Sequence, residues 1–214
     1  MQNLIIIGNS HAGRECYHLF RDMLEYDNIL ADTVRFAGFL SYNDYSGDLH
    51  GLENMFLGSV NKYAINPSDV FAIGIADTVI RQQVYEDMKK KEVRFFTLLS
   101  PFAHVSRDIQ IGEANIIGFG CAFSCDIEIG NANYFNSSIV LGHDVSIGDY
   151  NFLGPGAMVL GSASIGTGNL FGARSIVLDK ASVGDCNRIA PAAVVYKGCG
   201  NNRRMAGNPA LYID

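Results

Sequence analysis

The sequence has no tryptophan, only five prolines, and no apolar run approaching the roughly 18 residues that a membrane-spanning helix requires. We therefore expect no membrane insertion. It also lacks a basic patch or basic tail, and its formal net charge is −6. Nucleic-acid binding depends on clustered Lys and Arg, so this charge argues against a nucleic-acid partner. The chain opens with Met1, Gln2 and Asn3 and then a short strand-like run, not a signal peptide, which favours a cytoplasmic protein.

Cysteine is sparse, with five residues that lack the spacing of a disulfide framework or a zinc site. Cys121 and Cys125 are four residues apart, but no second pair completes a metal site. Reduced thiols in core or turn positions are therefore expected, in keeping with a cytoplasmic protein.

A six-residue repeat dominates the second half of the chain. From residue 105 to residue 195, every sixth residue is aliphatic or aromatic, without a polar interruption. The pattern Ile/Val-Gly-x-x-Asn recurs every eighteen residues within it. The apolar positions are Val105, Ile111, Ile117, Phe123, Ile129, Phe135, Leu141, Ile147, Leu153, Val159, Ile165, Phe171, Val177, Val183, Ile189 and Val195. The recurring asparagines are Asn115, Asn133, Asn151, Asn169 and Asn187.

A period of six equals one short strand plus one turn, so three units form an eighteen-residue coil. The repeat thus predicts a parallel β-helix of five stacked triangular coils, in which each apolar residue packs inward on its counterpart in the next coil. The asparagines should form a hydrogen-bonded ladder along one edge. The glycine that follows nine of the sixteen apolar residues should relieve crowding at the corners.

The first half of the chain has a different pattern, in which short apolar runs alternate with segments of helical spacing. This alternation predicts a small, Rossmann-like parallel α/β sheet over residues 1–102, followed by the β-helix domain over residues 103–214. Strands are expected at 4–8, 34–40, 70–76 and 93–99, and helices at 12–26 and 78–91. In the second helix, Asp77 or Thr78 is the expected N-cap, and the expected apolar face is Val79, Ile80, Val84 and Met88.

The first strand-to-helix turn, residues 8–13, reads GNSHAG. A glycine-rich turn that opens a helix can bind phosphate through backbone N–H groups and the helix dipole. The turn is not a complete dinucleotide fingerprint, because Ser10 stands where the middle glycine belongs. The motif alone is therefore a weak signal for phosphate binding, and an ordinary turn is the alternative. Asn9, Ser10 and His11 at the ligand-binding end of a parallel sheet favour phosphate binding.

His143 is the most promising reactive group in the repeat region. It follows an inward Leu141 and the corner residue Gly142, so it should lie at an accessible edge. Asp144 beside it can fix one imidazole tautomer, which would make the histidine a general base. The repeat region contains only one other histidine, His104, so three-histidine zinc binding of the kind used by some β-solenoid carbonic anhydrases is not available, and no metal is expected.

Taken together, these segments resemble the NeuD/PglD-type bacterial sugar acyltransferases, a hexapeptide-repeat family. The resemblance covers nearly the whole chain. It rests on residues 5–15 (IIIGNSHAGRE), 38–40 (GFL), 72–74 (AIG), 142–149 (GHDVSIGD), 154–157 (GPGA) and 207–210 (GNPA). The sequence departs from the family at Phe152, where members often carry a second histidine, and at Ser41, where an acidic residue is common.

The resemblance implies a left-handed β-helix, a homotrimer, and acetyl-CoA in the groove between adjacent β-helices. It implies that His143 is the catalytic base, that Asp144 orients it, and that the Gly161 N–H stabilises the oxyanion. The nucleotide-sugar acceptor would lie on the α/β domain. The implied acceptor-binding residues are Gly8, Asn9, Ser10, His11, Ser41 and Phe152. The implied cofactor-binding residues are Gly161, Gly172, Ala173, Lys180 and Pro191.

Three functions are compatible with this sequence. The first is N-acetylation of the amino group of a UDP- or dTDP-linked 4-amino-4,6-dideoxy sugar in surface-glycan biosynthesis. A single histidine suits this reaction, since an amine needs less activation than a hydroxyl. The second is O-acetylation of sialic acid or a related sugar. The third is a non-catalytic trimeric scaffold that binds sugar nucleotides. Phe152 supports this alternative, because it stands where family members often carry a second histidine.

Overall fold

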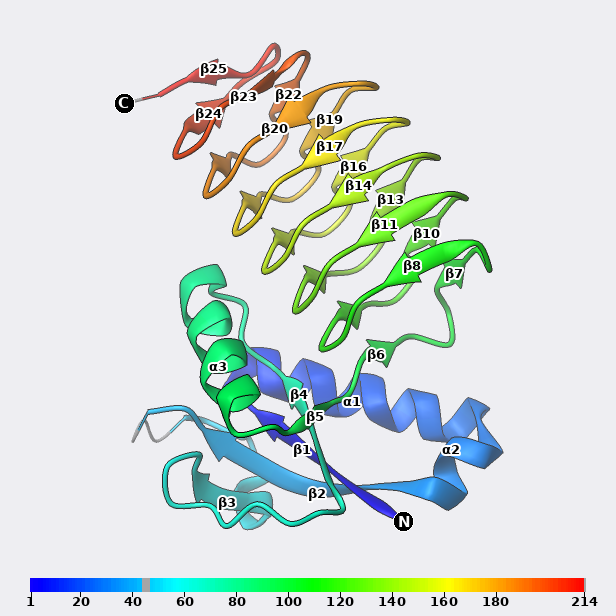
Figure 1. Ribbon diagram of the computed structural model, residues 1–214, viewed down its shortest axis with the longest axis vertical. Helices are drawn as coiled ribbons and strands as arrows, with labels where there is room; N and C mark the ends of the chain where they lie inside the picture. Colours follow the sequence, from blue (N-terminus) through cyan, green and yellow to red (C-terminus); the bar gives the residue numbers. More distant parts are fainter. Residues whose placement is uncertain (44–46, 214) are drawn as a thin grey trace.

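The structure, a computed structural model, describes residues 1–43 and 47–213 (Figure 1). Its first part is a parallel sheet with helices, and its second part is a β-solenoid. Among the described residues, no helix is both long enough and apolar enough to span a bilayer. The elements of the first part are β1 (Gln2–Ile7), α1 (His11–Tyr26), α2 (Asn28–Thr33), β2 (Val34–Ser41), η1 (Glu53–Met55), β3 (Phe56–Ser59), β4 (Asp69–Ile73), α3 (Thr78–Lys90) and β5 (Arg94–Phe95).

The first part is the expected Rossmann-like sheet, with the strand order β3-β2-β1-β4-β5 and all strands parallel. Alternate residues of β1 enter two separate apolar clusters. Leu4 and Ile6 pack with α1 on one side, and Ile5 and Ile7 pack with α3 on the other. A run of four apolar residues is thus buried on both faces of the sheet, as in parallel sheets generally. The short elements α2 and β3 were not predicted.

The predicted strand over residues 93–99 is divided between the two parts of the molecule. Arg94–Phe95 joins the α/β sheet as β5, whereas Leu98–Leu99 forms β6 and pairs with the solenoid strand Ile116–Ile117. The solenoid therefore begins at Leu98, shortly before the expected boundary between residues 102 and 103.

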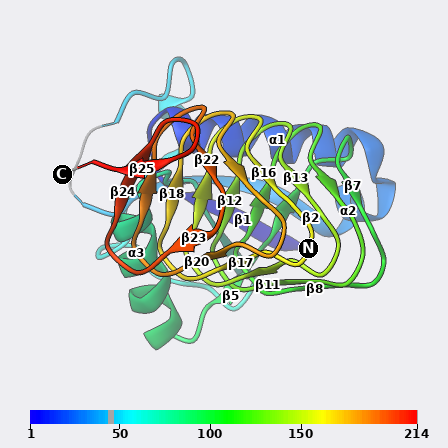
Figure 2. The same cartoon turned by 90° about the horizontal axis from the view of Figure 1, so that it is seen from above.

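The second part is a left-handed β-solenoid whose three faces are parallel sheets, and Figure 2 shows it from above. Residues pair with partners eighteen positions along the chain, for example Tyr134 with Phe152. The first face contains β6 (Leu98–Leu99), β9 (Ile116–Ile117), β12 (Tyr134–Phe135), β15 (Phe152–Leu153), β18 (Leu170–Phe171), β21 (Arg188–Ile189), β24 (Arg204–Ala206) and the antiparallel β25 (Leu211–Tyr212).

The other two faces have six strands each. The second face contains β7 (His104–Val105), β10 (Ala122–Phe123), β13 (Val140–Leu141), β16 (Met158–Val159), β19 (Ile176–Val177) and β22 (Val194–Val195). The third face contains β8 (Ile109–Ile111), β11 (Ile127–Ile129), β14 (Ser146–Ile147), β17 (Ser164–Ile165), β20 (Ser182–Val183) and β23 (Gly198–Cys199). We call the corner between the first and second faces the first edge, that between the second and third the second edge, and that between the third and first the third edge.

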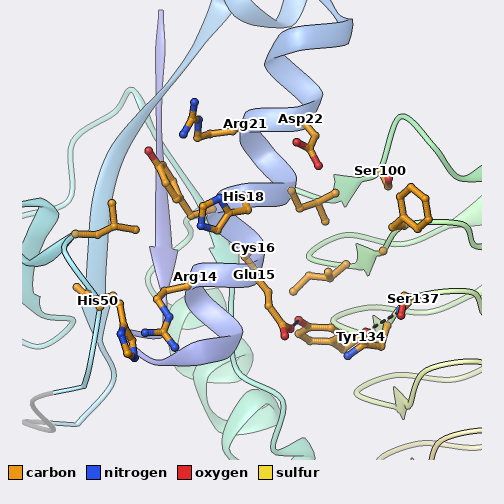
Figure 3. A pocket seen from close by; sticks show the side chains of 18 residues that line it. Arg14, Glu15, Cys16, His18, Arg21, Asp22, His50, Ser100, Tyr134 and Ser137 are labelled. Carbon is orange, nitrogen blue, oxygen red and sulfur yellow. Dashed lines mark hydrogen bonds between the residues drawn. The ribbon is translucent and has the colours of Figure 1, made fainter.

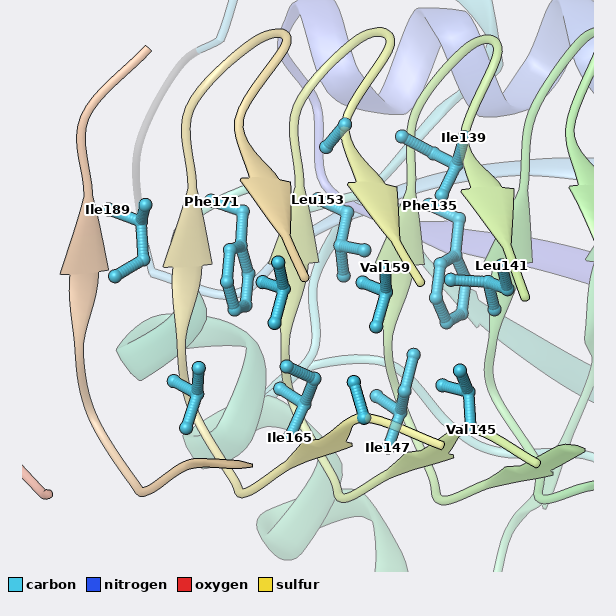
Figure 4. Close-up of a cluster of buried hydrophobic side chains, with 14 of the residues drawn as sticks. Phe135, Ile139, Leu141, Val145, Ile147, Leu153, Val159, Ile165, Phe171 and Ile189 are labelled. Atoms are coloured by element: carbon cyan, nitrogen blue, oxygen red, sulfur yellow. The ribbon is translucent and has the colours of Figure 1, made fainter. Parts of the chain in front are cut away.

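The repeated apolar residues form the solenoid core, as predicted (Figure 4). All of them are buried except Val105 and Ile111, which are partly buried in the first coil. The end coil has a neighbour on one side only, so its inward residues lack half of their cover.

The five asparagines form the expected ladder along the third edge, and all are fully buried. Each of the first four side-chain oxygens accepts from the next asparagine, and that of Asn187 accepts from the Arg203 N–H. Asn133 Oδ1, for example, accepts the backbone N–H of Asn151 at 2.8 Å and its amide Nδ2 at 3.1 Å. The ladder therefore satisfies polar groups that the coils would otherwise bury without a partner.

Replacing Asn151 by alanine should lower the free energy of unfolding by about 1–3 kcal/mol for each buried group left unpaired. The Asn169 backbone N–H and amide would both lose their acceptor, Asn151 Oδ1. Urea unfolding followed by circular dichroism would measure the change. Ser164→Ala is the matched control, because it removes only an exposed hydrogen bond between the hydroxyl groups of Ser164 and Ser182. Equal effects of the two substitutions would contradict a structural role for the asparagine ladder.

The repeated glycines are needed because neighbouring coils crowd them. They do not supply the left-handed backbone conformation of the corner. A Cβ atom on Gly142 would lie 2.6 Å from the backbone nitrogen of Gly161 in the next coil. The left-handed conformation falls two residues later, on Asp144, with φ 56°. The glycines are thus explained by the close stacking of backbones that 18-residue coils impose.

The three faces differ in what covers them. Outward residues of the first face include the buried Ile116 and Tyr134, which continue the apolar cluster of α1. The second face carries an uncovered apolar row, and the third face carries polar side chains. The outward row of the second face is Ala122, Val140, Met158, Ile176 and Val194. The outward row of the third face is Gln110, Glu128, Ser146, Ser164 and Ser182.

Arg81 joins α3 to the solenoid and is fully buried. Its guanidinium donates to the carbonyl oxygens of Ala132 (2.8 Å), Asn151 (2.8 Å) and Tyr150 (3.1 Å) on the third edge. It also donates to Ile75 (2.7 Å) and Ala76 (3.1 Å) after β4, and these five backbone acceptors involve no carboxylate. Burial lowers the pKa of Arg81 to about 10, so the side chain remains charged at neutral pH.

The expected apolar face of α3 was wrong in part. Val79 and Ile80 are exposed, by 54% and 37%, while Arg81 and Tyr85 are buried with Val84 and Met88. The helix is rotated because Arg81 finds its acceptors on the solenoid, which compensates for its burial. The N-cap was correct, since Asp77 accepts from the N–H groups of residues 79 and 80.

Candidate functional site

His143 lies at the second edge, the edge opposite the face that the α/β part covers. Its Nδ1 is 2.6 Å from Asp144 Oδ2, and both side chains are more than half exposed. The carboxylate favours the tautomer with the proton on Nδ1, which leaves the lone pair of Nε2 free to accept a proton. Asp144 has a left-handed backbone at this corner, with φ 56°, and its carboxylate lies against the preceding ring. The pair therefore has the arrangement of an oriented general base.

Gly161 lies directly beside this imidazole in the next coil. A Cβ at Gly161 would be 2.8 Å from His143 Nε2, so the ring occupies the space that a side chain would fill. The Ser162 N–H donates to the His143 carbonyl at 2.8 Å, and this bond holds the two corners in register. The Gly161 N–H itself has no acceptor within the part of the chain that the structure describes. It is therefore available to a ligand oxygen next to Nε2.

Gly161→Ala should lower kcat by about 100-fold, because a displacement of roughly 1 Å at a catalytic group has an effect of that order. The backbone of Gly161 is not left-handed, so the methyl group should disturb the imidazole more than the fold. Steady-state kinetics and thermal unfolding would separate these effects. Gly200→Ala is the matched control, because nothing lies within 4 Å of its added Cβ. Unchanged kcat in Gly161→Ala would contradict the proposed contact.

The expected cofactor-binding residues fall on two different edges. Gly161 and Lys180 lie on the second edge with His143, and the Lys180 N–H donates to the Gly161 carbonyl at 3.0 Å. Gly172, Ala173 and Pro191 instead lie on the first edge. The apolar second face separates the two groups within one chain.

The predicted first turn is tightly packed. Gly8 has φ +130°, and a Cβ there would collide with the Gly74 carbonyl oxygen. Gly74 in turn packs on Gly13, whose Cα would be 2.7 Å from an added Cβ. These glycines therefore permit close approach of β1, α1 and β4, which is a structural role that the sequence motif does not distinguish from phosphate binding.

Only part of the expected acceptor site is accessible. Asn9 and Ser41 are buried. Ser10 is partly exposed, and His11 is exposed. Ser10 stands at the N-cap of α1 without a side-chain capping bond. Phe152 is partly buried on the first face, with its ring 5.4 Å from that of Tyr134. It faces the α/β part, not the second edge that carries His143.

A pocket of about 580 Å³ lies between α1, the segment around His50, and the first edge (Figure 3). None of the expected acceptor-binding residues lines it. Its polar lining is Arg14, Glu15, His18, Arg21, Asp22, His50, Ser100, Tyr134, Asn136 and Ser137. The spacing of charged residues on α1 is the sequence signal that could have indicated this pocket. Positions 14, 18 and 21, and positions 15 and 22, fall on neighbouring stripes of one helix face.

The described residues contain no group of three or more His, Cys, Asp or Glu side chains placed to hold a metal ion. All five cysteines are free. Burial raises the pKa of the Cys16 thiol to about 12 and that of Cys121 to about 11, so both remain protonated core residues.

No protein-family model and no curated protein matches this chain. Solved structures do match it over its full length. A variant of perosamine N-acetyltransferase from Caulobacter crescentus, in complex with CoA and GDP-perosamine, has a TM-score of 0.87 at 19% identity, with 98% of that chain covered. The acetyltransferase domain of PglB from Neisseria gonorrhoeae has a TM-score of 0.87 at 18% identity, with 100% of that chain covered.

WeeI from Acinetobacter baumannii has a TM-score of 0.77 at 21% identity, and each chain covers 100% of the other. This chain has the fold of these proteins. The shared fold comprises both the α/β part and the solenoid, since each alignment covers the whole of this chain.

Proposed function

We propose that this protein is an acetyl-CoA-dependent N-acetyltransferase that acts on the amino group of a nucleotide-linked sugar in surface-glycan biosynthesis. The observation that carries the proposal is the oriented His143–Asp144 pair beside the free Gly161 N–H. The similar structures support it, because they include an N-acetyltransferase with CoA and GDP-perosamine and an acetyltransferase domain with acetyl coenzyme A.

In the proposed reaction, the acceptor amine attacks the carbonyl carbon of the thioester and forms the C–N bond. His143 Nε2 takes the proton that the nitrogen loses, and Asp144 stabilises the resulting imidazolium. The Gly161 N–H donates to the oxygen that becomes negatively charged in the tetrahedral intermediate. The C–S bond then breaks, and the proton held by His143 passes to the departing thiolate of CoA.

Acetyl-CoA would extend along the second edge from His143 toward later coils. Lys180 lies two coils beyond His143, a separation of about 10 Å at the usual strand spacing. Lys197 occupies the same edge in the following coil. Both lysines can attract the phosphates of CoA.

A homotrimer would complete this cofactor site. The uncovered apolar row of the second face, with Val140 and Met158 exposed by 36% and 39%, is suited to burial against other chains. If three second faces point toward one threefold axis, the second edge of each chain lies beside the first edge of the next. Gly172, Ala173 and Pro191 would then contact the acetyl-CoA that a neighbouring chain holds.

The acceptor would be a 4-amino-4,6-dideoxy sugar linked to UDP or dTDP, bound on the α/β part. Ser10 and His11 at the uncapped start of α1 are its accessible expected contacts. Gly8, Asn9 and Ser41 would support the turn, and Phe152 would act through the packing of the first face. GDP-linked sugars also belong in the test, because one similar protein was crystallised with GDP-perosamine.

The direct test is release of the CoA thiol from acetyl-CoA in the presence of amino sugars linked to UDP, dTDP or GDP, with mass spectrometry of the product. We expect an amide product with one of them. Acetylation of sialic acid instead would support the O-acetyltransferase alternative. Binding of nucleotides without any binding of acetyl-CoA would support a non-catalytic scaffold. Sedimentation of the purified protein as a monomer would contradict the trimeric site.

A further inference from the structure

The pocket beside α1 has opposite charges at its two sides. Figure 3 shows Arg14 and His50 together on one side, and Glu15 with Tyr134 on the side of the solenoid. A ligand that filled the pocket would meet a positively charged side chain at one end and a carboxylate at the other.

Arg14 has an unmatched donor. Its Nη1 atom is buried and has no hydrogen-bond partner among the described residues. The carboxylate of Asp48 is 3.9 Å away, beyond hydrogen-bond distance, and Asp48 also lies 2.9 Å from His50 Nε2. An unpaired buried guanidinium N–H is unfavourable in a native structure. It points to a ligand acceptor, and the full charge of the guanidinium favours an anionic one.

Glu15 is held in place on the opposite side. Its Oε2 accepts the Tyr134 hydroxyl at 2.9 Å. Tyr134 is buried, and burial raises its pKa well above the ordinary value, so the hydroxyl remains a donor. This bond uses one carboxylate oxygen of an exposed residue. Within the described residues the other oxygen has no hydrogen-bond partner, so it can accept from a donor of the ligand.

We propose that this pocket binds the acceptor by both ends, with Arg14 and His50 on an anionic group and Glu15 on the sugar amine. The inference rests on the proposed function for the identity of the ligand as an acceptor. Its chemical class is a sugar that carries both an anion and an amine. The anion is the diphosphate of a nucleotide or the carboxylate of an acidic sugar, and both are suited to a guanidinium.

The position of the pocket agrees with this assignment. Asn136 and Ser137, which line it, lie on the first edge in the same coil as His143. In a threefold ring, this part of the first edge faces the second edge of the neighbouring chain at about the same height. An amine bound at Glu15 therefore lies on the side from which the neighbouring chain would present its catalytic base.

The anion end is tested by isothermal titration calorimetry of the full-length protein with UDP, dTDP, GDP and free sialic acid. Arg14→Gln should weaken the binding probe by about 10-fold or more, as for a lost charge-assisted hydrogen bond, and Arg14→Lys should restore part of it. Arg35→Gln is the matched control, because Arg35 is exposed on β2 and does not line the pocket, and it should change affinity less than about 2-fold. Equal losses in the Arg14 and Arg35 variants would overturn the anion site.

The probe that responds identifies the source of the anion. Arg14-dependent binding of a nucleoside diphosphate assigns the diphosphate, and Arg14-dependent binding of sialic acid assigns the carboxylate. If no probe binds with a dependence on Arg14, the anion site is wrong. Circular dichroism of each variant would establish that it is folded.

The amine end is tested by Glu15→Gln, which keeps an acceptor for Tyr134 but removes the charge. KM for the amino-sugar nucleotide should rise about 10-fold or more, while the affinity for the nucleoside diphosphate stays unchanged. Glu25→Gln is the matched control, because Glu25 is exposed on the same helix and does not line this pocket. An unchanged KM in Glu15→Gln, or a larger effect in Glu25→Gln, would overturn the assignment of the amine.

The failure of this acceptor site and the failure of the proposed reaction give different results. Acetyl transfer that is unaffected by Arg14→Gln and Glu15→Gln would leave the proposed function standing and remove this acceptor site. Arg14-dependent binding of a nucleoside diphosphate without transfer to any amine would support the anion site and contradict the proposed function.

Discussion

Replacement of His143 by alanine should lower kcat by about 100- to 10,000-fold, the usual contribution of a positioned general base. The affinity for acetyl-CoA should change little, because the imidazole is more than half exposed at the second edge and supports no part of the core. Steady-state kinetics with the amino-sugar nucleotide, and calorimetry with CoA, would measure the two quantities. A kcat near that of the unmodified protein would exclude His143 as the base.

Asp144→Asn should also lower kcat, by about 10-fold or more, because an amide does not hold the proton on Nδ1 as a carboxylate does. Asp126 provides a matched control. It occupies the equivalent corner one coil earlier, with φ 55° against 56° for Asp144, but has no histidine beside it. Asp126→Asn should therefore leave kcat unchanged, and equal losses in both variants would indicate a structural effect of the corner.

Arg81→Met should lower the free energy of unfolding by more than about 3 kcal/mol, because each buried carbonyl left unpaired costs roughly 1–3 kcal/mol. Methionine replaces much of the aliphatic volume but none of the donors, so the carbonyls of Ala132 and Asn151 would lose their partner. For a chain of this length, the melting temperature should fall by about 6–12 °C. Thermal and urea unfolding would measure both effects.

Arg94→Met is the appropriate control for this substitution. Arg94 is exposed and donates to the carbonyls of Pro67 at 2.6 Å and Asp69 at 3.5 Å, so its loss removes bonds that water can replace. Its effect should be below about 1 kcal/mol. A similar loss of stability in the two arginine variants would contradict the role of Arg81 as the polar connection between the α/β part and the solenoid.

The solenoid was predictable because its stability is local and repeated. Every sixth residue points inward, so one rule applied sixteen times defines the core, and the eighteen-residue spacing of residues such as Asn133 and Asn151 defines the ladder. Periodicity amplifies a weak signal in this way. The corner position of His143 followed from the same rule, because it comes directly after an inward Leu141 and Gly142.

Contacts between distant segments were not predictable from this pattern. The helical spacing of Val79 and Ile80 indicated a buried face, but three of the five carbonyls that accept from Arg81 lie more than 50 residues along the chain. Similarly, the first-turn motif indicated phosphate binding, whereas the close approach of Gly8 and Gly74 requires glycine for packing. A motif lists residue types, and it does not specify which groups stand opposite them.

The sequence by itself determined the coil length, the inward residues, the asparagine ladder, the parallel sheet of the first half and the candidate pair His143–Asp144. Each of these depends on spacing along one continuous segment, and spacing is what a sequence records. Only the tertiary structure decided that the first face is covered while the second stays apolar and open, that Arg81 is buried, and that Arg14 and Glu15 of α1 share a pocket with Tyr134 of the solenoid. These features depend on how two independently patterned halves are docked, because burial and unpaired donors are properties of surfaces that meet only after both halves have folded.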